Sequence, residues 1–216
     1  ILLGYTGLLS LGHALYFGFG AYVSALVLKE TPSFWAAMGV VLVGSAAFGL
    51  VTGLIANRVR GVYFALVTFG RAQVFAKAVY NTRALGASDG LIGIPIVPIN
   101  LGVVTVMSNA PVAFFLVTLG FVTLLYAVSA YLLDTSFGRV LGALRANESR
   151  VPFLGYSTHR ARLAIYVFAS VVAALSGALY PMLRGFVSPE LMFFAASGNA
   201  VITVVIGGVG TLVGAL

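Results

Sequence analysis

The chain has 216 residues, of which 61% are hydrophobic and only 8% are charged, and its net charge is +7. Soluble domains carry about 25% charged residues, so this composition excludes an ordinary water-facing surface and predicts a membrane protein. The apolar runs are long and do not alternate, which favours an all-α polytopic fold over a β-barrel. The absence of Cys excludes thiolate metal sites within these residues, and the basic residues indicate loop topology rather than nucleic-acid binding.

A helix that crosses the bilayer needs about 20 predominantly apolar residues. Several segments approach this length. They are residues 11–28, 34–56, 62–80, 112–133, 163–183 and the segment from 191 to the end. The sequence therefore predicts one transmembrane domain over residues 1–216, with about six transmembrane helices surrounded by membrane lipid. Because Ile1 is not Met and Leu216 stands inside an apolar run, we expect the domain to be truncated at both ends.

The second of these segments carries small residues in register. Ser45, Gly49 and Gly53 recur at every fourth position, so they share one face of a helix. In lipid, small residues on one face let two helix backbones approach closely. Glycines are common in membrane helices in general, but three small residues in register favour a helix-packing face.

The third segment is apolar in its first half and carries Arg71, Gln73 and Lys77 in its second half. A charge near the bilayer centre is costly, so such side chains either face a cavity or extend to the membrane surface. We expect Arg71 and Lys77 to extend to the outer interface. His13, Gln73 and Asn199 are polar groups at membrane depth that either face a translocation pathway or serve in helix packing, and the sequence leaves both interpretations open.

The segments between the apolar runs differ in character. Residues 81–100 contain Asp-Gly and two prolines, which are typical of a loop. Residues 101–110 are too short to cross the membrane. The glycine-rich tail at residues 206–214 favours a bent or re-entrant segment.

Basic residues predict the orientation of the chain. With alternating helices, the loop at residues 57–61 and the loop at residues 134–162 lie on the same side. The basic loop residues on that side are Arg58, Arg60, Arg139, Arg145, Arg150, Arg160 and Arg162, and those on the other side are Lys29, Arg83 and Arg184. Because cytoplasmic loops carry the excess of Lys and Arg, we expect residues 134–162 to be cytoplasmic.

The loop at residues 134–162 is the longest polar interval in the chain. Four of its apolar residues fall at the helical spacing i, i+3, i+4 and i+7. They are Phe137, Val140, Leu141 and Leu144. This spacing predicts a short amphipathic helix. Its apolar face suits either a helix that lies on the membrane surface or a helix that docks into a groove of a partner protein.

No acidic residue falls in the middle of an expected helix. The acidic residues are Glu30, Asp89, Asp134, Glu148 and Glu190. Carriers coupled to protons or sodium usually use carboxylates within the membrane, so this pattern argues against a secondary transporter. No Walker A motif is present, so ATP would have to be hydrolysed by another subunit. The sequence also offers no acid–base or metal-ligand constellation for an enzyme.

Short stretches of recognisable sequence occur in order along nearly the whole chain. They are residues 4–13 (GYTGLLSLGH) with 18–22 (GFGAY), residues 60–68 (RGVYFALVT), residues 88–95 (SDGLIGIP), and residues 137–155, which begin with FGR and are followed by 177–180 (GALY) and 186–189 (FVSP). Each is weak alone. Together they resemble the LivM-type permease subunits of bacterial ABC importers for branched-chain amino acids.

The resemblance implies a non-enzymatic, cofactor-free permease of the bacterial inner membrane. In such importers a second, LivH-like permease completes the translocation path, two cytoplasmic ATPases drive transport, and a periplasmic binding protein delivers the substrate. Closely related permeases import urea or short-chain amides, so that alternative stays open. A self-sufficient channel or secondary carrier is the alternative from a different class.

The resemblance also implies that the cytoplasmic loop holds a coupling helix, which these permeases place in a cleft of the ATPase. It assigns coupling to Phe137, Arg139, Leu141, Leu144, Arg145, Glu148 and Gly155. Glu148 and Gly155 stand where the family carries an acidic residue and a glycine. Arg150, Val151 and Pro152 replace the small or acidic residues of the family, so the contacts within the ATPase cleft are expected to differ.

Overall fold

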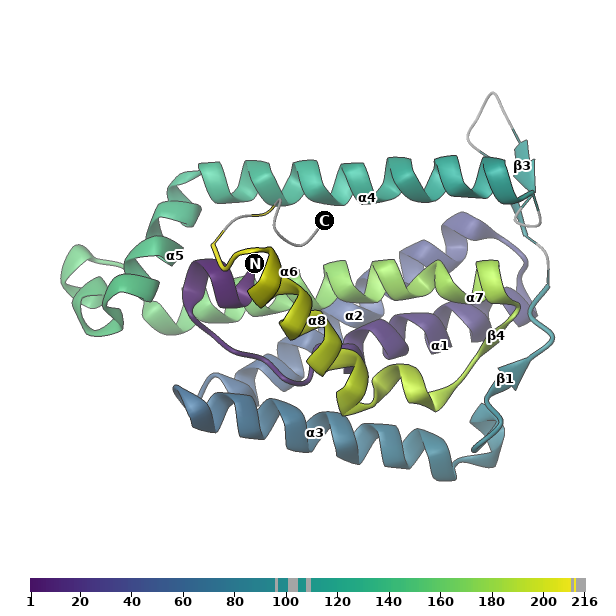
Figure 1. Cartoon of the computed structure of the whole chain (residues 1–216), viewed down its shortest axis with the longest axis horizontal. Coiled ribbons are helices and arrows are strands. Elements are labelled where there is room, and N and C mark those ends of the chain that lie inside the picture. The colour runs from purple at the N-terminus through teal and green to yellow at the C-terminus, as the bar shows by residue number, and fades with distance from the viewer. Residues whose placement is uncertain (96, 101–104, 108–109, 211, 213–216) are drawn as a thin grey trace.

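The computed structural model describes residues 1–216 except 96, 101–104, 108–109, 211 and 213–216. The main helices make an elongated bundle, in which most of them lie side by side (Figure 1). They are α1 (Ala14–Glu30), α2 (Phe34–Ala56), α3 (Val62–Asn81), α4 (Pro111–Asp134), α6 (Thr158–Ala178) and α8 (Phe194–Gly207). The predicted all-α polytopic membrane fold is confirmed.

The lengths of these helices differ more than the sequence indicates. Among the described residues, four helical spans are long and apolar enough to cross a membrane, namely α2, α3, α4 and the continuous stretch Thr158–Arg184. The helix α1 has 17 residues and α8 has 14, so both are shorter than these spans. Of the six predicted crossings, α1 and α8 are thus the two that the structure makes short.

Shorter elements connect the long helices. The helical ones are η1 (Leu2–Thr6), η2 (Arg83–Leu85), α5 (Ser136–Ala146), η3 (Glu148–Leu154), α7 (Tyr180–Arg184) and η4 (Pro189–Met192). The strands are β1 (Leu91–Ile92), β2 (Pro98–Asn100), β3 (Thr105–Met107) and β4 (Phe186–Val187). The tail at residues 206–214, for which a bent segment is expected, lies partly outside the described residues, as does the stretch 101–110.

The helix α1 forms the centre of the bundle because glycines let α6 approach its backbone. A Cβ atom on Gly20 would lie 1.9 Å from the carbonyl oxygen of Ala174 in α6. A Cβ atom on Gly177 of α6 would lie 1.9 Å from the carbonyl oxygen of Phe17 in α1. Two reciprocal contacts of this kind hold the helices at a distance that only glycine permits.

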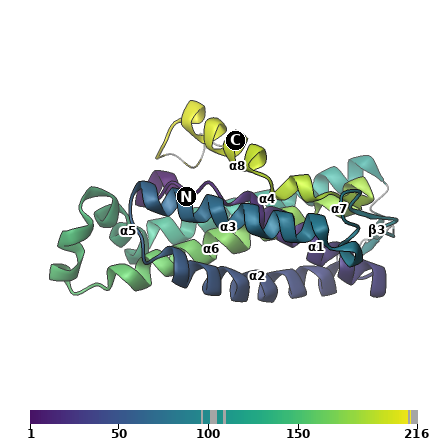
Figure 2. The ribbon, with the colours of Figure 1, turned by 90° about the horizontal axis from the view of Figure 1, so that it is seen from below.

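The small residues Ser45, Gly49 and Gly53 lie on the buried face of α2. A Cβ atom on Gly49 would lie 3.0 Å from the Cβ of Ser170, and one on Gly53 would lie 2.9 Å from the ring of Tyr166. Both neighbours belong to α6. This face of α2 therefore packs against the same helix that packs against α1, and Figure 2 shows α2 and α8 on opposite sides of the bundle.

The connecting segments gather at the two ends of the bundle. At one end β1 pairs with β4 in antiparallel register, with Leu91 opposite Val187, so two loops that are distant in sequence meet. At the other end, η3, which follows α5, meets the connection between α2 and α3 through an ion pair from Arg60 to Glu148. The two loops that the sequence places on one side therefore lie together.

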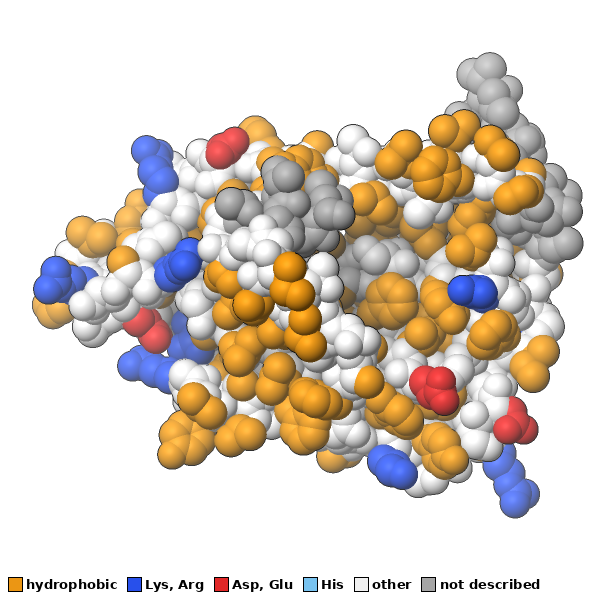
Figure 3. Space-filling model, in the orientation of Figure 1, with side chains coloured by type: hydrophobic (Ala, Val, Ile, Leu, Met, Phe, Trp, Pro, Cys, Tyr) orange, Lys and Arg blue, Asp and Glu red, His pale blue; other side chains and the backbone are white. Residues whose placement is uncertain are grey.

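The helix that contains the fifth apolar segment begins earlier than the sequence predicts. The helix α6 starts at Thr158 rather than at residue 163, because the Ser157 hydroxyl caps it by accepting a hydrogen bond from the backbone N–H of Arg160. Arg160 and Arg162 thus belong to the first turns of α6. Elsewhere the surface is largely apolar, and Figure 3 shows hydrophobic side chains along the bundle, with basic side chains more frequent toward the α5 end than toward the opposite end.

Candidate functional site

A cluster of polar side chains lies inside the bundle, where α1, α2, α3 and α6 meet. The hydroxyl of Tyr16 lies 2.5 Å from the Thr52 hydroxyl and 2.9 Å from the Tyr166 hydroxyl. Arg71 of α3 donates from Nη2 to the Tyr166 hydroxyl at 3.0 Å, and from Nη1 to the backbone carbonyl of Thr52. The ring of His13 packs edge-on against both tyrosine rings. We call these five residues the polar cluster.

The position of Arg71 differs from the sequence-based expectation. Instead of extending to the outer membrane interface, its guanidinium turns inward and bonds α2 and α6. A planar guanidinium with five donors can bind several oxygens at once, and neutral hydroxyl and carbonyl oxygens then replace the water that the charge loses. Arg71 therefore connects three helices instead of anchoring one to the membrane surface.

An apolar cavity of about 340 Å³ adjoins the polar cluster at His13. Its wall is formed mainly by aliphatic side chains, with hydroxyls from two serines. The lining residues include Leu3, Leu9, Ser10, His13, Val172, Ala173, Ser197, Val201 and Val204. The Nδ1 atom of His13 bonds the Ser10 hydroxyl at 2.8 Å, whereas its buried Nε2 atom has no hydrogen-bond partner among the described residues. The cavity thus combines an aliphatic wall with one imidazole.

The three polar residues singled out in the sequence occupy different environments. Only His13 lines the apolar cavity. Gln73 is half-buried on α3, and its Nε2 atom has no hydrogen-bond partner among the described residues. Asn199 is exposed on α8, on a different face from Ser197 and Ala200, which line the cavity. The structure therefore does not bring the three together.

The apolar face of α5 is covered by the chain itself. The side chain of Leu141 is 0% exposed, and Val140 and Leu144 are also buried. These residues pack in one cluster with Leu2, and half-buried Phe137 lies against the same cluster. The fold thus packs this face internally, and the assignment of Phe137, Leu141 and Leu144 to coupling stays a prediction.

The polar residues assigned to coupling have separate roles. Arg139 is exposed and donates to the Ser136 hydroxyl at 2.9 Å. Arg145 donates to the backbone carbonyl of Gly4 and so ties α5 to η1. Gly155 ends η3 with a φ angle of 81°, in the left-handed region that side chains other than glycine rarely adopt. Arg139 and Arg145 are both exposed residues, but only Arg145 also bonds the backbone of another element.

The exposed apolar surface of the loop lies at its tip, beyond α5. Phe153 is 90% exposed, Leu154 is 65% exposed and Tyr156 is 51% exposed. These residues are not among the sequence-based candidates, although three large apolar side chains around a glycine in a polar loop indicate an exposed apolar surface. We call Phe153, Leu154 and Tyr156 the loop tip.

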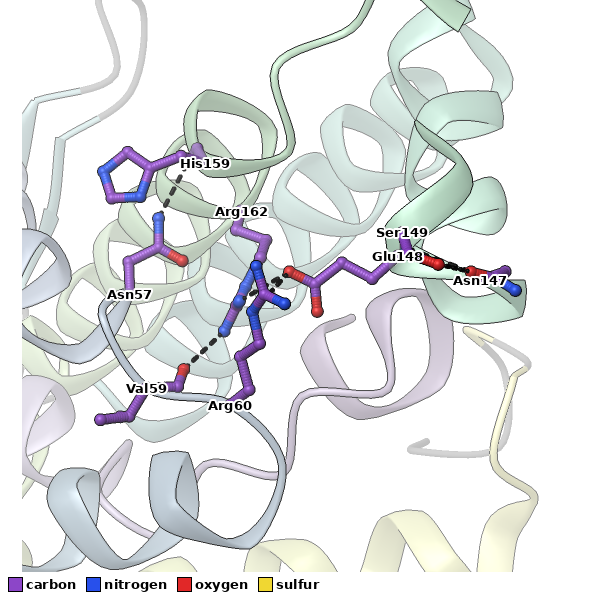
Figure 4. A network of polar contacts seen from close by, with 8 residues as sticks. All are labelled: Asn57, Val59, Arg60, Asn147, Glu148, Ser149, His159 and Arg162. Carbon is purple, nitrogen blue, oxygen red and sulfur yellow. Dashed lines mark hydrogen bonds and ion pairs between the residues drawn. The ribbon is translucent and has the colours of Figure 1, made fainter. Parts of the chain in front are cut away.

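An ionic network holds the loop against the bundle (Figure 4). Glu148 accepts from Arg162 at 3.0 Å and pairs with Arg60 at 3.3 Å. Arg162 also donates to the backbone carbonyl of Val59 at 3.0 Å, and Asn57 donates to the backbone carbonyl of His159 at 2.8 Å. Glu148 is thus bonded within the chain, and η3 is fixed to the connection between α2 and α3.

Comparison with known proteins identifies the family of this chain. A family model described as the permease component of the branched-chain amino acid transport system matches residues 1–216. The chain belongs to this permease family. It is 31% identical, over 98% of its length, to the high-affinity branched-chain amino acid transport system permease protein LivM of Salmonella typhimurium, and 30% identical to LivM of Escherichia coli over the same share.

The match to these permeases covers part of their length. The chain spans 55% of each of the two LivM proteins. No solved structure matches the chain. The chain is thus a member of the branched-chain amino acid permease family, and its described residues include four apolar helical spans of membrane length. In this permease, residues 134–162 comprise α5, η3 and the start of α6.

Proposed function

We propose that the chain is the membrane-spanning part of an ATP-driven importer for branched-chain amino acids. A second, LivH-like permease completes the path, two cytoplasmic ATPases supply the energy, and a periplasmic binding protein delivers the substrate. The observation that carries this proposal is the family match over residues 1–216. The protein acts without catalytic chemistry or a cofactor of its own, in the inner membrane of a bacterium.

The loop tip is the part of residues 134–162 that contacts the ATPase. Its three apolar side chains are exposed in the loop at residues 134–162, which carries most of the arginines together with the connection between α2 and α3, and a cytoplasmic partner is expected there. Exposed aromatic side chains are frequent anchors at protein interfaces. This assignment replaces the apolar face of α5 as the contact surface and keeps exposed Arg139 beside it.

Movement at the loop tip reaches the membrane helices through packed contacts. The buried face of α5 lies in one cluster with residues of α6 and η1, and Arg145 bonds the backbone of η1. Packed elements move as units because their side chains interlock. When ATP closes the ATPase dimer, α5 therefore carries the displacement to α6 and η1, both of which line the apolar cavity.

The apolar cavity is the segment of the translocation path that this chain contributes. Its aliphatic wall suits the side chains of leucine, isoleucine and valine better than the polar faces of urea or a short amide. His13 supplies a polar group at its edge, whereas Gln73 and Asn199 remain candidates for the path or for packing outside this cavity.

A self-sufficient channel or carrier is the competing function. The chain lacks acidic residues in the middle of its membrane-length helices, so a coupling carboxylate would have to lie elsewhere. The test is reconstitution of the full-length permease into proteoliposomes, alone and with its ATPases, second permease and binding protein. We expect labelled leucine uptake only in the complete complex with ATP, inhibited by isoleucine and valine but not by urea or acetamide. Robust uptake by the permease alone would overturn the proposal.

A further inference from the structure

A second cavity, of about 350 Å³, opens at the α5 end of the bundle, where η3 meets the ends of α2 and α6. Its lining residues include Asn57, Arg60, Glu148, Thr158 and Arg162. Figure 4 shows the ionic network that forms one of its walls. We call this cavity the arginine pocket. Tyr156 of the loop tip also lines it, and the proposed ATPase contact gives no role to Arg60, Thr158 or Arg162.

Two buried donors in the arginine pocket have no acceptor in the part of the chain that the structure describes. The side chain of Arg162 is 4% exposed, and its Nη1 and Nη2 atoms bond Glu148 and the Val59 carbonyl. Its Nε atom is buried and has no hydrogen-bond partner among the described residues, and the same holds for the hydroxyl of Thr158. Buried polar groups are nearly always paired, so these two donors indicate an oxygen-rich ligand.

The charge balance of the pocket favours an anion. Arg60 and Arg162 share the single carboxylate of Glu148, which leaves one positive charge among the three side chains. The helix α6 begins at Thr158, and its N-terminus adds partial positive charge. A ligand with one negative charge and several acceptor oxygens would satisfy both the charge and the free donors.

The pocket lies at the depth of lipid headgroups. The apolar helix α2 ends at Ala56, directly before Asn57, and the apolar part of α6 follows a polar first turn that begins at Thr158. The residues at this boundary therefore mark the change from hydrocarbon to polar surroundings. Ile55 and Val62, on either side of the connection between α2 and α3, expose their apolar side chains, as a surface covered by acyl chains would.

We propose that the arginine pocket binds the phosphodiester group of an anionic phospholipid. Arg60, which is 74% exposed, and the Nε atom of Arg162 donate to the phosphate oxygens, and the Thr158 hydroxyl donates a third bond. The bound headgroup ties η3 to the connection between α2 and α3. Inorganic phosphate or a soluble phosphate ester offers the same chemistry without the acyl chains, so the experiment must separate the two sources.

The test measures lipid binding to the full-length permease in detergent by native mass spectrometry. Phosphatidylglycerol, phosphatidylcholine and soluble glycerol 1-phosphate are titrated separately. We expect one tightly bound phosphatidylglycerol and no comparable binding of the other two. Arg60→Gln should weaken the tightest phosphatidylglycerol about fivefold, as expected for one arginine at an anionic membrane surface. Thr158→Val should weaken it in the same direction.

Arg58→Gln is the matched control, because Arg58 lies in the same connection but does not line the pocket. It should leave the tightest phosphatidylglycerol in place. Equal losses for Arg58→Gln and Arg60→Gln would show general attraction to a basic surface and overturn the proposal. Binding of glycerol 1-phosphate as tight as that of phosphatidylglycerol would overturn the assignment to a lipid. Melting temperatures of all variants show that each remains folded.

Discussion

At the residue scale, the most informative feature is a cation that the bundle keeps inside. Arg71 bonds oxygens from α2 and α6, and the Tyr16, Thr52 and Tyr166 side chains form a continuous chain of hydroxyls beside it. Placing a charged side chain inside a membrane protein costs more free energy than placing an apolar one, and such charges mark functional positions. The polar cluster adjoins the apolar cavity at His13, so the hydrogen bonds that hold the helices together lie beside the proposed translocation path.

Tyr166→Phe tests the polar cluster. The change removes the hydroxyl that accepts from Arg71 and leaves a charged donor without that partner in the interior. We expect the free energy of unfolding to fall by about 1.5–3 kcal/mol, the range for hydrogen bonds to charged groups. Thermal unfolding of the purified permease in detergent measures this. Tyr131→Phe removes a hydroxyl from an exposed tyrosine and should change little. Equal effects of the two changes would contradict the role of the cluster.

Two substitutions in the loop separate folding from partner binding. Leu141 is fully buried on the apolar face of α5, so Leu141→Ala should lower the free energy of unfolding by about 2–5 kcal/mol.

Phe153 is exposed at the loop tip, so Phe153→Ser should leave the melting temperature unchanged and reduce co-purification of the ATPase at least tenfold, as for an interface anchor. Ile92→Ser, at the opposite end, is the control for an exposed apolar residue. Normal ATPase recovery with Phe153→Ser would refute the assignment of the loop tip.

At the element scale, backbone contact between α1 and α6 organises the bundle. Both Gly20 and Gly177 face a carbonyl oxygen of the other helix. The small face of α2 packs on α6 as well, so α6 contacts two helices through small residues. Exposed helices such as α4 lack this kind of contact over most of their length and present apolar side chains outward.

Gly20→Ala and Gly177→Ala test the contact of α1 with α6. An added methyl group would lie 1.9 Å from a backbone oxygen in each case, so the helices must separate. We expect each change to lower the free energy of unfolding by about 1–3 kcal/mol, as overpacking does, and to lower the melting temperature. Gly39→Ala in α2 is the control, because nothing lies within 4 Å of its added Cβ. If all three variants melt like the parent protein, the close approach is not what holds the bundle together.

At the scale of the whole molecule, the charges are divided between the two ends. The connections that carry most of the arginines meet at the α5 end, while β1 and β4 join the loops at the other end. This arrangement agrees with the orientation that the basic residues predict, in which the α5 end is cytoplasmic. The cytoplasmic location of residues 134–162 remains a prediction.

Introduced thiols test the orientation. The 216 residues contain no Cys, so Ser88→Cys and Ser149→Cys each place a single exposed thiol among them, at opposite ends of the bundle. We expect a membrane-impermeant maleimide to label Ser88→Cys in intact spheroplasts and Ser149→Cys only after the membrane is opened. The two changes are chemically matched, so each serves as the control for the other. The reverse labelling pattern would place the loop tip in the periplasm and contradict its contact with an ATPase.

The sequence determined the class of this protein and much of its layout. Its lack of charges and its apolar runs predict an all-α membrane fold, because hydrocarbon demands that backbone groups pair within each segment. The spacing of Phe137, Val140, Leu141 and Leu144 predicts the helix α5, since apolar residues at i, i+3 and i+4 share one face. The resemblance to the permease family, carried by short stretches along the chain, agrees with the family match.

Only the tertiary structure decided what each face and each polar group contacts. The periodicity of α5 shows that one face is apolar but not whether protein, lipid or a partner covers it, and the fold covers it with its own chain. Arg71 could extend outward or inward, and the choice depends on oxygens supplied by α2 and α6. The short pairing of β1 with β4 and the arginine pocket also join residues that are distant in sequence. Local patterns do not encode such contacts, because they form only when the helices pack.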